Sequence, residues 1–135
     1  MTPEQCFAAE SLRRLDPLPL ECDGITRALS MLLARDGIEH QVQIGALTVA
    51  GVGRIPHHWW ILLDGGEICD GRARMWLGTD ERVPQGVFVA ETWQEYASHG
   101  AVPTVWNPVL FGILTGAPIE AYPRASGAQP RLSNG

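Results

Sequence analysis

Cys22 has the residue type and the position that most directly suggest covalent chemistry. It lies in the first turn of a predicted helix, three residues before Ile25 and therefore toward the predicted buried face. A helix N-terminus carries a partial positive charge and unpaired N–H groups, which favour a thiolate and offer donors to a developing oxyanion. A free cysteine is nevertheless more often a packed apolar residue. Cys22 alone therefore leaves a nucleophile and a core residue as alternatives.

Two adjacent histidines, His57 and His58, could supply the base that a nucleophilic cysteine needs. Both begin a predicted strand. An imidazole can take the proton of a thiol and later return a proton to the leaving group, because its pKa is close to neutrality. The alternative is that these are solvent-exposed or structural histidines beside the tryptophans that follow them. The sequence therefore offers a base without showing which histidine it is.

Asp70 could orient the base, and the length of the preceding turn decides which histidine it meets. It lies in the second arm of a predicted hairpin, twelve residues after His58. If the turn comprises residues 64–66, Asp70 lies opposite Trp60 and shares a sheet face with His58. If the turn has two residues, the pairing shifts by one and Asp70 lies on the side of His57. A turn residue at a strand end is the structural alternative for this aspartate.

Capping residues and apolar spacing predict the elements that must position these side chains. The predicted helices span residues 2–15, 22–35, 92–100 and 107–114. The predicted strands span residues 38–50, 57–63, 67–70 and 86–90, with a glycine-rich loop at 51–56 and with 72–77 as an extension of the hairpin's second arm. This order favours an α+β fold in which a central helix packs on an antiparallel sheet.

The order of these motifs resembles the transglutaminase-like branch of the papain-like cysteine enzymes. The matching segments are Cys22-Asp23-Gly24, the helix end that runs into Gly37-Ile38, the His58-Trp59-Trp60 strand and the hairpin from Asp64 to Asp70. The resemblance extends over about residues 20–77 and is carried by order and spacing. Small bacterial or phage transglutaminase-like proteins, and the proteases that remove leader peptides in lasso-peptide biosynthesis, look similar in the same segments.

The resemblance implies a papain-like or transglutaminase-like core with a Cys-His-Asp triad. It assigns Cys22 as the nucleophile, His58 rather than His57 as the general base and acid, and Asp70 as the residue that orients His58. It also makes Trp60 and Asp23 candidates for contact with substrate or an oxyanion. The implied activity is a cysteine-dependent peptidase or amidase that works through an acyl-thioester, with transfer to an amine as a variant and with no cofactor.

The composition limits the remaining function classes. The chain has 135 residues, a net charge of −5 and 45% hydrophobic residues, which fits one domain of an ordinary globular protein. We expect a single domain over residues 1–123, a flexible tail over 124–135 and a cytoplasmic location, without a membrane span or a secretory signal. All ten basic residues are arginines, so lysine chemistry is excluded, and the acidic balance disfavours nucleic acid. A peptide or protein substrate is the expected partner.

Two other interpretations of the same residues remain. The main one is a non-catalytic binding or inhibitor module, of which a phage-encoded protein is one example. Such a module has the same fold, and its Cys22 is only a packed residue. A zinc site made of Cys22, one of the paired histidines and Cys69 is weaker, because no two ligands have a familiar spacing. Cys69 is instead predicted to point away from Asp70 into the core. Arg72 is predicted to be a solvated surface residue, with a groove rim or an acidic partner as the alternative.

Overall fold

The computed structural model describes residues 1–125 and shows an α+β protein with a five-stranded antiparallel sheet. In chain order the elements are α1 (Pro3–Leu15), α2 (Cys22–Arg35), β1 (His40–Val49), β2 (Gly53–Leu63), β3 (Ile68–Asp70), α3 (Ala73–Leu77), β4 (Gly86–Phe88), β5 (Gln94–Val102), α4 (Pro108–Thr115) and the 3-10 turn η1 (Ile119–Ala121). The tail expected at 124–135 lies outside the described residues from 126 onward. Within residues 1–125 no helix has the length and apolar character needed to cross a membrane.

The two N-terminal helices form as their sequence signals predict. Thr2 accepts a hydrogen bond from the backbone of Gln5, and the Gln5 side chain accepts one from the backbone of Thr2, which completes a capping box ahead of Pro3. Helix α2 ends just before Gly37, whose φ of 73° lies in the left-handed region that glycine reaches without strain. Cys22 is therefore the first residue of a helix that is buried over most of its length.

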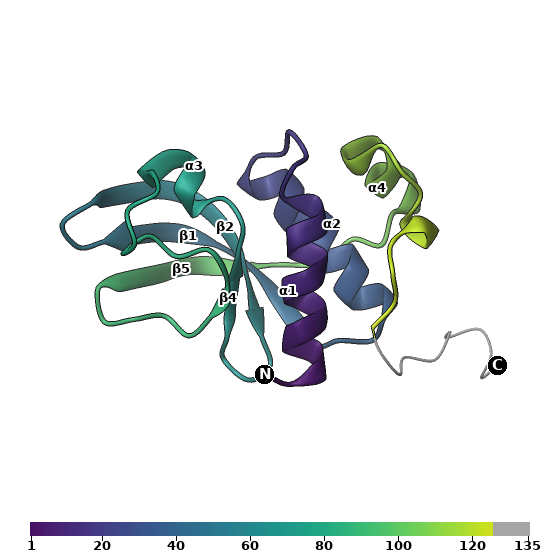
Figure 1. Ribbon diagram of the computed structural model, residues 1–135, viewed down its shortest axis with the longest axis horizontal. Helices are drawn as coiled ribbons and strands as arrows, with labels where there is room; N and C mark the ends of the chain where they lie inside the picture. The colour runs from purple at the N-terminus through teal and green to yellow at the C-terminus, as the bar shows by residue number, and fades with distance from the viewer. Residues whose placement is uncertain (126–135) are drawn as a thin grey trace.

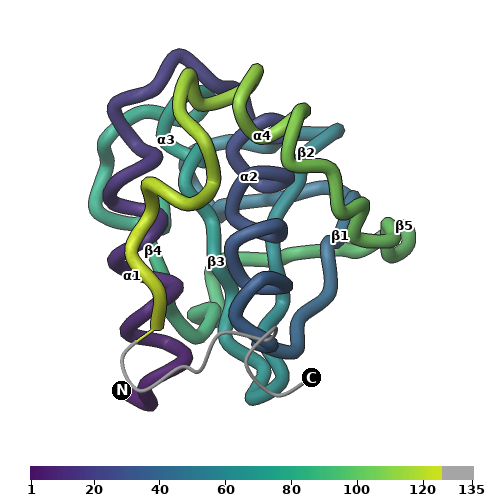
Figure 2. Tube along the Cα trace, turned by 90° about the vertical axis from the view of Figure 1, so that its right-hand side faces the viewer, coloured from purple at the N-terminus to yellow at the C-terminus, as the bar shows by residue number. Residues whose placement is uncertain are grey.

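The strands are arranged in the order β4-β3-β2-β1-β5. Figure 1 shows α1 and α2 packed beside one part of this sheet. Strands β1, β2 and β5 extend beyond these two helices, and α3 lies near the part of the strands that is farther from them. Figure 2 shows α2 running alongside β1 and β2, with α1 next to it. The helix that begins with Cys22 thus lies directly against the strand that carries His58.

Two groups of buried apolar residues hold the elements together. The larger one joins α1 and α2 to the sheet through side chains such as Leu29, Val42 and Ile61. The smaller one lies beneath α3 and contains Leu47, Val49, Ile55, Ala73 and Val83. Burial of apolar side chains is the dominant favourable term in folding, so both groups fix the position of β2.

An irregularity in the sheet sets the direction of the His58 side chain. β1 pairs Gly45 with His58 but Leu47 with Ile55, so β2 has two residues, Pro56 and His57, opposite a single residue of β1. A bulge of this kind shifts the alternation of the strand by one residue and re-aims the side chains that follow. As a result His58 faces the same side of the sheet as Ile55, and His57 is left exposed.

Gly45 pairs with His58 of β2 on one side and with Ser98 of β5 on the other. A Cβ atom at this position would lie 2.0 Å from the carbonyl oxygen of Ala97 and 2.9 Å from the Cα atom of Ser98, both backbone atoms of β5. Backbone cannot move aside as a flexible side chain can, so only glycine fits here. The pairing of β1 with β5, and with it the position of Tyr96, depends on this glycine.

We expect Gly45→Ala to lower the free energy of unfolding by at least about 2 kcal/mol, because the added methyl group forces β5 away from β1. Urea denaturation measures the change. The matched control is Gly112→Ala in α4, where the nearest atom to an added Cβ is the carbonyl oxygen of Ala117 at 3.9 Å. Equal stability of the two variants would contradict the close approach at Gly45.

Four predicted elements differ from the structure. Residues 92–100 were expected to form a helix, but Gln94–Val102 forms β5, because pairing with the open edge of β1 outweighs the local capping signal. Residues 72–77 were expected to continue the strand, but Ala73–Leu77 forms α3. The expected loop at 51–56 is shorter, since β2 already begins at Gly53. The strand expected at 86–90 ends at Phe88, whereas the helix expected at 107–114 forms as α4.

Candidate active site

Cys22 is placed at the N-terminus of α2 without a side chain that caps the helix. Glu21 occupies the capping position in an extended conformation, but its side chain makes no capping hydrogen bond. In the first turn, the carboxylate of Asp23 accepts a hydrogen bond from the backbone N–H of Gly24 at 2.9 Å. Cys22 is half-buried, whereas Cys6 is exposed and Cys69 is buried. The helix start therefore offers Cys22 a positive environment and leaves its side chain accessible.

His58 and Asp70 form a buried pair across the sheet. The β2–β3 pairing, in which Ile61 faces Cys69, is the register of a three-residue turn, so of the two registers that the sequence leaves open the structure has the one in which Asp70 meets His58 and not His57. Nε2 of His58 lies 2.7 Å from Oδ2 of Asp70, and both side chains have an exposed fraction of 0%. The geometry assigns the Nε2 proton to this hydrogen bond, with the carboxylate as the acceptor.

Asp70 also accepts three further hydrogen bonds that the sequence did not reveal. The hydroxyl of Tyr96 donates to Oδ2 at 2.7 Å. The backbone N–H groups of Arg72 and Ala73 donate to Oδ1 at 3.0 Å and 3.1 Å. Burial and the neighbouring carboxylate raise the pKa of Tyr96, so its hydroxyl stays a donor. Four donors thus fix one carboxylate, and through it the plane of the His58 ring.

The other ring nitrogen of His58 is left for Cys22. Nδ1 is buried and has no hydrogen-bond partner among the described residues. Burial by itself would lower the pKa of His58, but its hydrogen bond to Asp70 and the nearby Cys22 side chain raise that pKa to about 9. The Cys22 side chain is therefore close enough to influence the ring, although no hydrogen bond joins its sulfur to Nδ1. Unbound catalytic pairs commonly have such loose geometry.

Arg72 joins the aspartate strand to the segment that leads into α2. Its guanidinium donates to the carbonyl oxygens of Asp16, Leu18 and Leu20 and to the side chain of Asp16. The side chain is only 6% exposed, so the prediction of a solvated surface arginine is wrong. Apart from its type, nothing in the local sequence distinguishes this arginine, because all its partners except the carbonyl oxygen of Gly71 lie more than fifty residues earlier. The contacts hold the entry to the Cys22 helix next to Asp70.

We expect Arg72→Met to lower the free energy of unfolding by about 3 kcal/mol and to slow the reaction of Cys22 with thiol reagents. The physical reason is that four carbonyl oxygens and the Asp16 carboxylate lose a charged donor while the stem volume is kept. Urea denaturation and mass spectrometry measure the two effects. Arg54→Met, at an exposed arginine of β2, is the control and should leave both quantities unchanged. Equal effects of the two substitutions would contradict the positioning role of Arg72.

Trp60 and Asp23 are both candidates for contact with substrate, but they lie in different environments. Trp60 is buried, lies 6.1 Å from the His58 ring in a stacked arrangement, and contacts the Tyr96 ring edge to face at 4.9 Å. It supports the histidine from the side. Asp23 is exposed and its carboxylate only accepts hydrogen bonds, so it fits a role at the helix start better than a role as an oxyanion donor.

Cys69, the third residue of the predicted metal alternative, lies in the core, where burial together with the charges of Asp70 and Glu67 raises the pKa of its thiol to about 12. Within residues 1–125 no group of three or more histidine, cysteine, aspartate and glutamate side chains is arranged to hold a metal ion.

Comparison with known proteins adds no assignment. No family model matches this chain, and neither a curated protein nor a solved structure matches it.

Proposed function

We propose that this protein is a cysteine-dependent hydrolase of the peptidase or amidase class, with Cys22, His58 and Asp70 as its triad and a papain-like or transglutaminase-like core. One observation carries the proposal: a buried histidine is held by a carboxylate through Nε2, its Nδ1 has no hydrogen-bond partner among the described residues, and the half-buried cysteine at a helix start is close enough to raise its pKa. A packed, inert cysteine would not require a charged histidine next to it, since burying an imidazole costs free energy without a function to offset it.

The reaction that fits this arrangement is acyl transfer to Cys22. A protonated His58 beside the thiol favours the thiolate, whose sulfur attacks the substrate carbonyl carbon. The N–H groups of the first turn of α2 donate to the oxyanion. The carbon–nitrogen bond then breaks, and Nδ1 of His58 gives its proton to the departing amine. Water adds to the thioester, its proton returns to Nδ1, and the carbon–sulfur bond breaks. Asp70 keeps its hydrogen bond to Nε2 throughout.

Hydrolysis is the simpler outcome of the two that an acyl-thioester allows. Transfer to an amine needs a second site for the acceptor, whereas hydrolysis needs only water. The expected substrate is a peptide or protein, and the cell compartment that suits a free, reactive thiol is the cytoplasm. A non-catalytic binding module remains the competing function, and it differs in one measurable respect, namely that Cys22 would form no thioester that turns over.

The proposal is tested with p-nitrophenyl acetate, an ester that any accessible cysteine nucleophile can attack. We expect a rapid burst of p-nitrophenolate, an acetyl group on Cys22 by mass spectrometry, and continued slow turnover as the thioester hydrolyses. The exposed Cys6 serves as an internal control for ordinary thiol reactivity. Acetylation of Cys22 no faster than that of Cys6, or acetylation without turnover, would refute the enzyme and favour the binding module.

The raised pKa of His58 also predicts how stability depends on pH. The folded state holds the proton with a pKa of about 9, above the usual 6.5. The stabilisation is therefore complete below pH 6.5 and is lost as the pH rises through 9. We expect the free energy of unfolding to fall over this range by an amount on the order of 1 to 3 kcal/mol more than in His58→Gln. Urea titrations at pH 6 and pH 9.5 measure the difference, and parallel curves would contradict it.

A further inference from the structure

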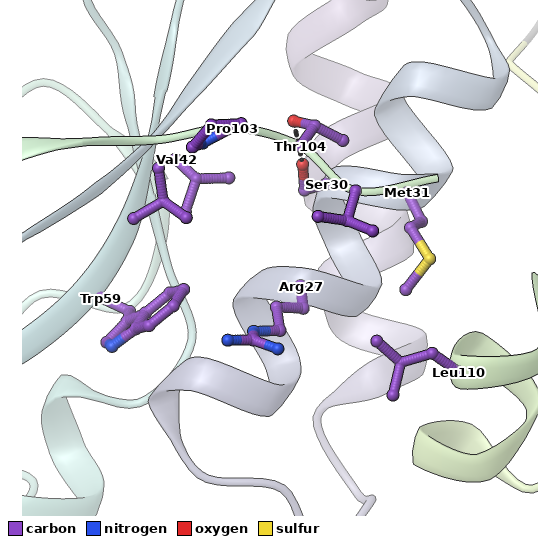
Figure 3. Close-up of a pocket in the computed structure, with 10 residues that line it drawn as sticks. Arg27, Ser30, Met31, Val42, Trp59, Pro103, Thr104 and Leu110 are labelled. Atoms are coloured by element: carbon purple, nitrogen blue, oxygen red, sulfur yellow. Dashed lines mark hydrogen bonds between the residues drawn. The ribbon is translucent and has the colours of Figure 1, made fainter. Parts of the chain in front are cut away.

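A separate pocket lies along α2, between the sheet and the segment that follows β5 (Figure 3). Its volume is about 110 Å³. Its walls are mostly apolar and include Met31, Val42, Trp59, Val102 and Leu110. None of the three triad residues lines it, so it is a site in its own right, next to the candidate active site.

The size and lining of the pocket limit what it can hold. Pockets that bury a drug-sized ligand or a cofactor span roughly 300 to 1,000 Å³. A cavity of about 150 Å³ holds a benzene ring. The present pocket is smaller than both and fits one aliphatic side chain. The hydroxyls of Ser30 and Thr104, which also line it, are 2.8 Å apart and bond to each other, so they place no polar demand on a ligand (Figure 3).

One charged group lines the same pocket. The guanidinium of Arg27 lies 5.1 Å from the centre of the Trp59 ring, over its face, and Figure 3 shows the two side chains next to each other at the pocket. Among residues 1–125, Arg27 takes part in no ion pair. Stacking on an aromatic ring holds a guanidinium in place while leaving its N–H edge free for a carboxylate.

We propose that this pocket binds the C-terminal residue of a peptide, with its aliphatic side chain in the pocket and its α-carboxylate on Arg27. The pocket has room for one residue, and it offers that residue both an apolar space and the cation of Arg27. A residue that carries both an aliphatic side chain and a carboxylate is one at the end of a chain. An aspartate or glutamate would place its charge where the pocket is apolar, and desolvating a carboxylate there costs free energy.

The pocket also stands in a defined relation to the proposed nucleophile, and only this step rests on the proposed function. Arg27 follows Cys22 by five residues of one helix, a rise of about 7.5 Å. Trp59 follows His58 directly in β2. An extended peptide advances about 3.3 to 3.6 Å per residue. Measured along the axis of α2, the offset between Cys22 and Arg27 therefore corresponds to about two residues of an extended peptide.

Isothermal titration calorimetry on Cys22→Ala tests the pocket without any turnover. The probes are acetyl-Gly-Gly-Leu with a free carboxylate, the same peptide as its C-terminal amide, and acetyl-Gly-Gly-Gly with a free carboxylate. We expect the leucine acid to bind at least about fivefold more tightly than either of the other two, since each lacks one of the two contacts. Arg27→Gln should abolish the preference for the acid over the amide, whereas Arg54→Gln, at an exposed arginine of β2, should keep it.

The result that overturns the proposal is equal affinity for the acid and the amide, or no binding of either. Binding of 4-methylpentanoate as tight as that of the leucine acid would also overturn it, because the site would then recognise a free aliphatic acid. These outcomes are independent of the p-nitrophenyl acetate experiment, which does not use the pocket. The two proposals can therefore fail separately.

Discussion

His58→Ala is expected to slow the acetylation of Cys22 by p-nitrophenyl acetate by at least about a hundredfold, the lower range for loss of a general base. The physical reason is the position of Nδ1, which is buried, has no partner among the described residues and lies near the thiol. Without the imidazole, no group at this site takes the thiol proton, and no cation favours the thiolate. The burst phase and the mass of the acetylated protein measure the effect.

His57→Ala is the matched control for this prediction. His57 is exposed and belongs to the β2 bulge, whereas His58 is buried against Asp70. We expect the control to keep the rate within about twofold of the unmodified protein, because it removes an imidazole without touching the buried pair. Equal losses in both variants would mean that the strand, and not the His58 ring, is what the reaction needs. Near pH 6, iodoacetamide should likewise label Cys22 first in the control but not in His58→Ala.

Local signals in the sequence were enough to bring the His58 and Asp70 strands together. The turn at 64–66 is short and rich in glycine, and its length fixes which residues lie opposite each other. The start of α2 at Cys22 follows equally from the apolar spacing of the helix. In both cases the deciding contacts lie within about a dozen residues, where spacing along the chain determines spacing in the fold.

The partners that complete the site could not be found in this way. Tyr96 reaches Asp70 from β5, and β5 exists only because the far edge of β1 accepts it as a neighbour. The residues around Tyr96 carry a helix-capping pattern that pairing with β1 overrides. Arg72 is similar, since all but one of its partners are backbone carbonyls, which have no sequence signature. A sequence pattern shows which residues are suited to chemistry, but contacts between distant segments decide which of them are held rigidly.

Asp70→Ala is expected to have the largest effect of any single change, because four donors share this carboxylate. Nε2 of His58 and the hydroxyl of Tyr96 bond to Oδ2, and the backbone N–H groups of Arg72 and Ala73 bond to Oδ1. Removing one partner from a buried charged pair costs about 3 to 5 kcal/mol. We expect a loss of stability of that order, measured by urea denaturation. Asp64→Asn, at the exposed hairpin turn, is the control and should change stability by less than about 0.5 kcal/mol.

Asp70→Asn separates the structural role of this residue from its role in orienting His58. An amide can keep its oxygen toward the N–H groups of Arg72 and Ala73, but its NH₂ group then meets two donors, His58 and Tyr96. His58 can resolve this only by accepting at Nε2, which moves the ring proton to Nδ1 and leaves a neutral ring that cannot take a proton from Cys22. We expect most of the stability to remain while acetylation of Cys22 slows by roughly two to four orders of magnitude. Nitrogen-15 NMR of the imidazole shows which ring nitrogens carry a proton, so a ring that still carries the Nε2 proton together with a normal rate would show that the carboxylate does not govern the reaction.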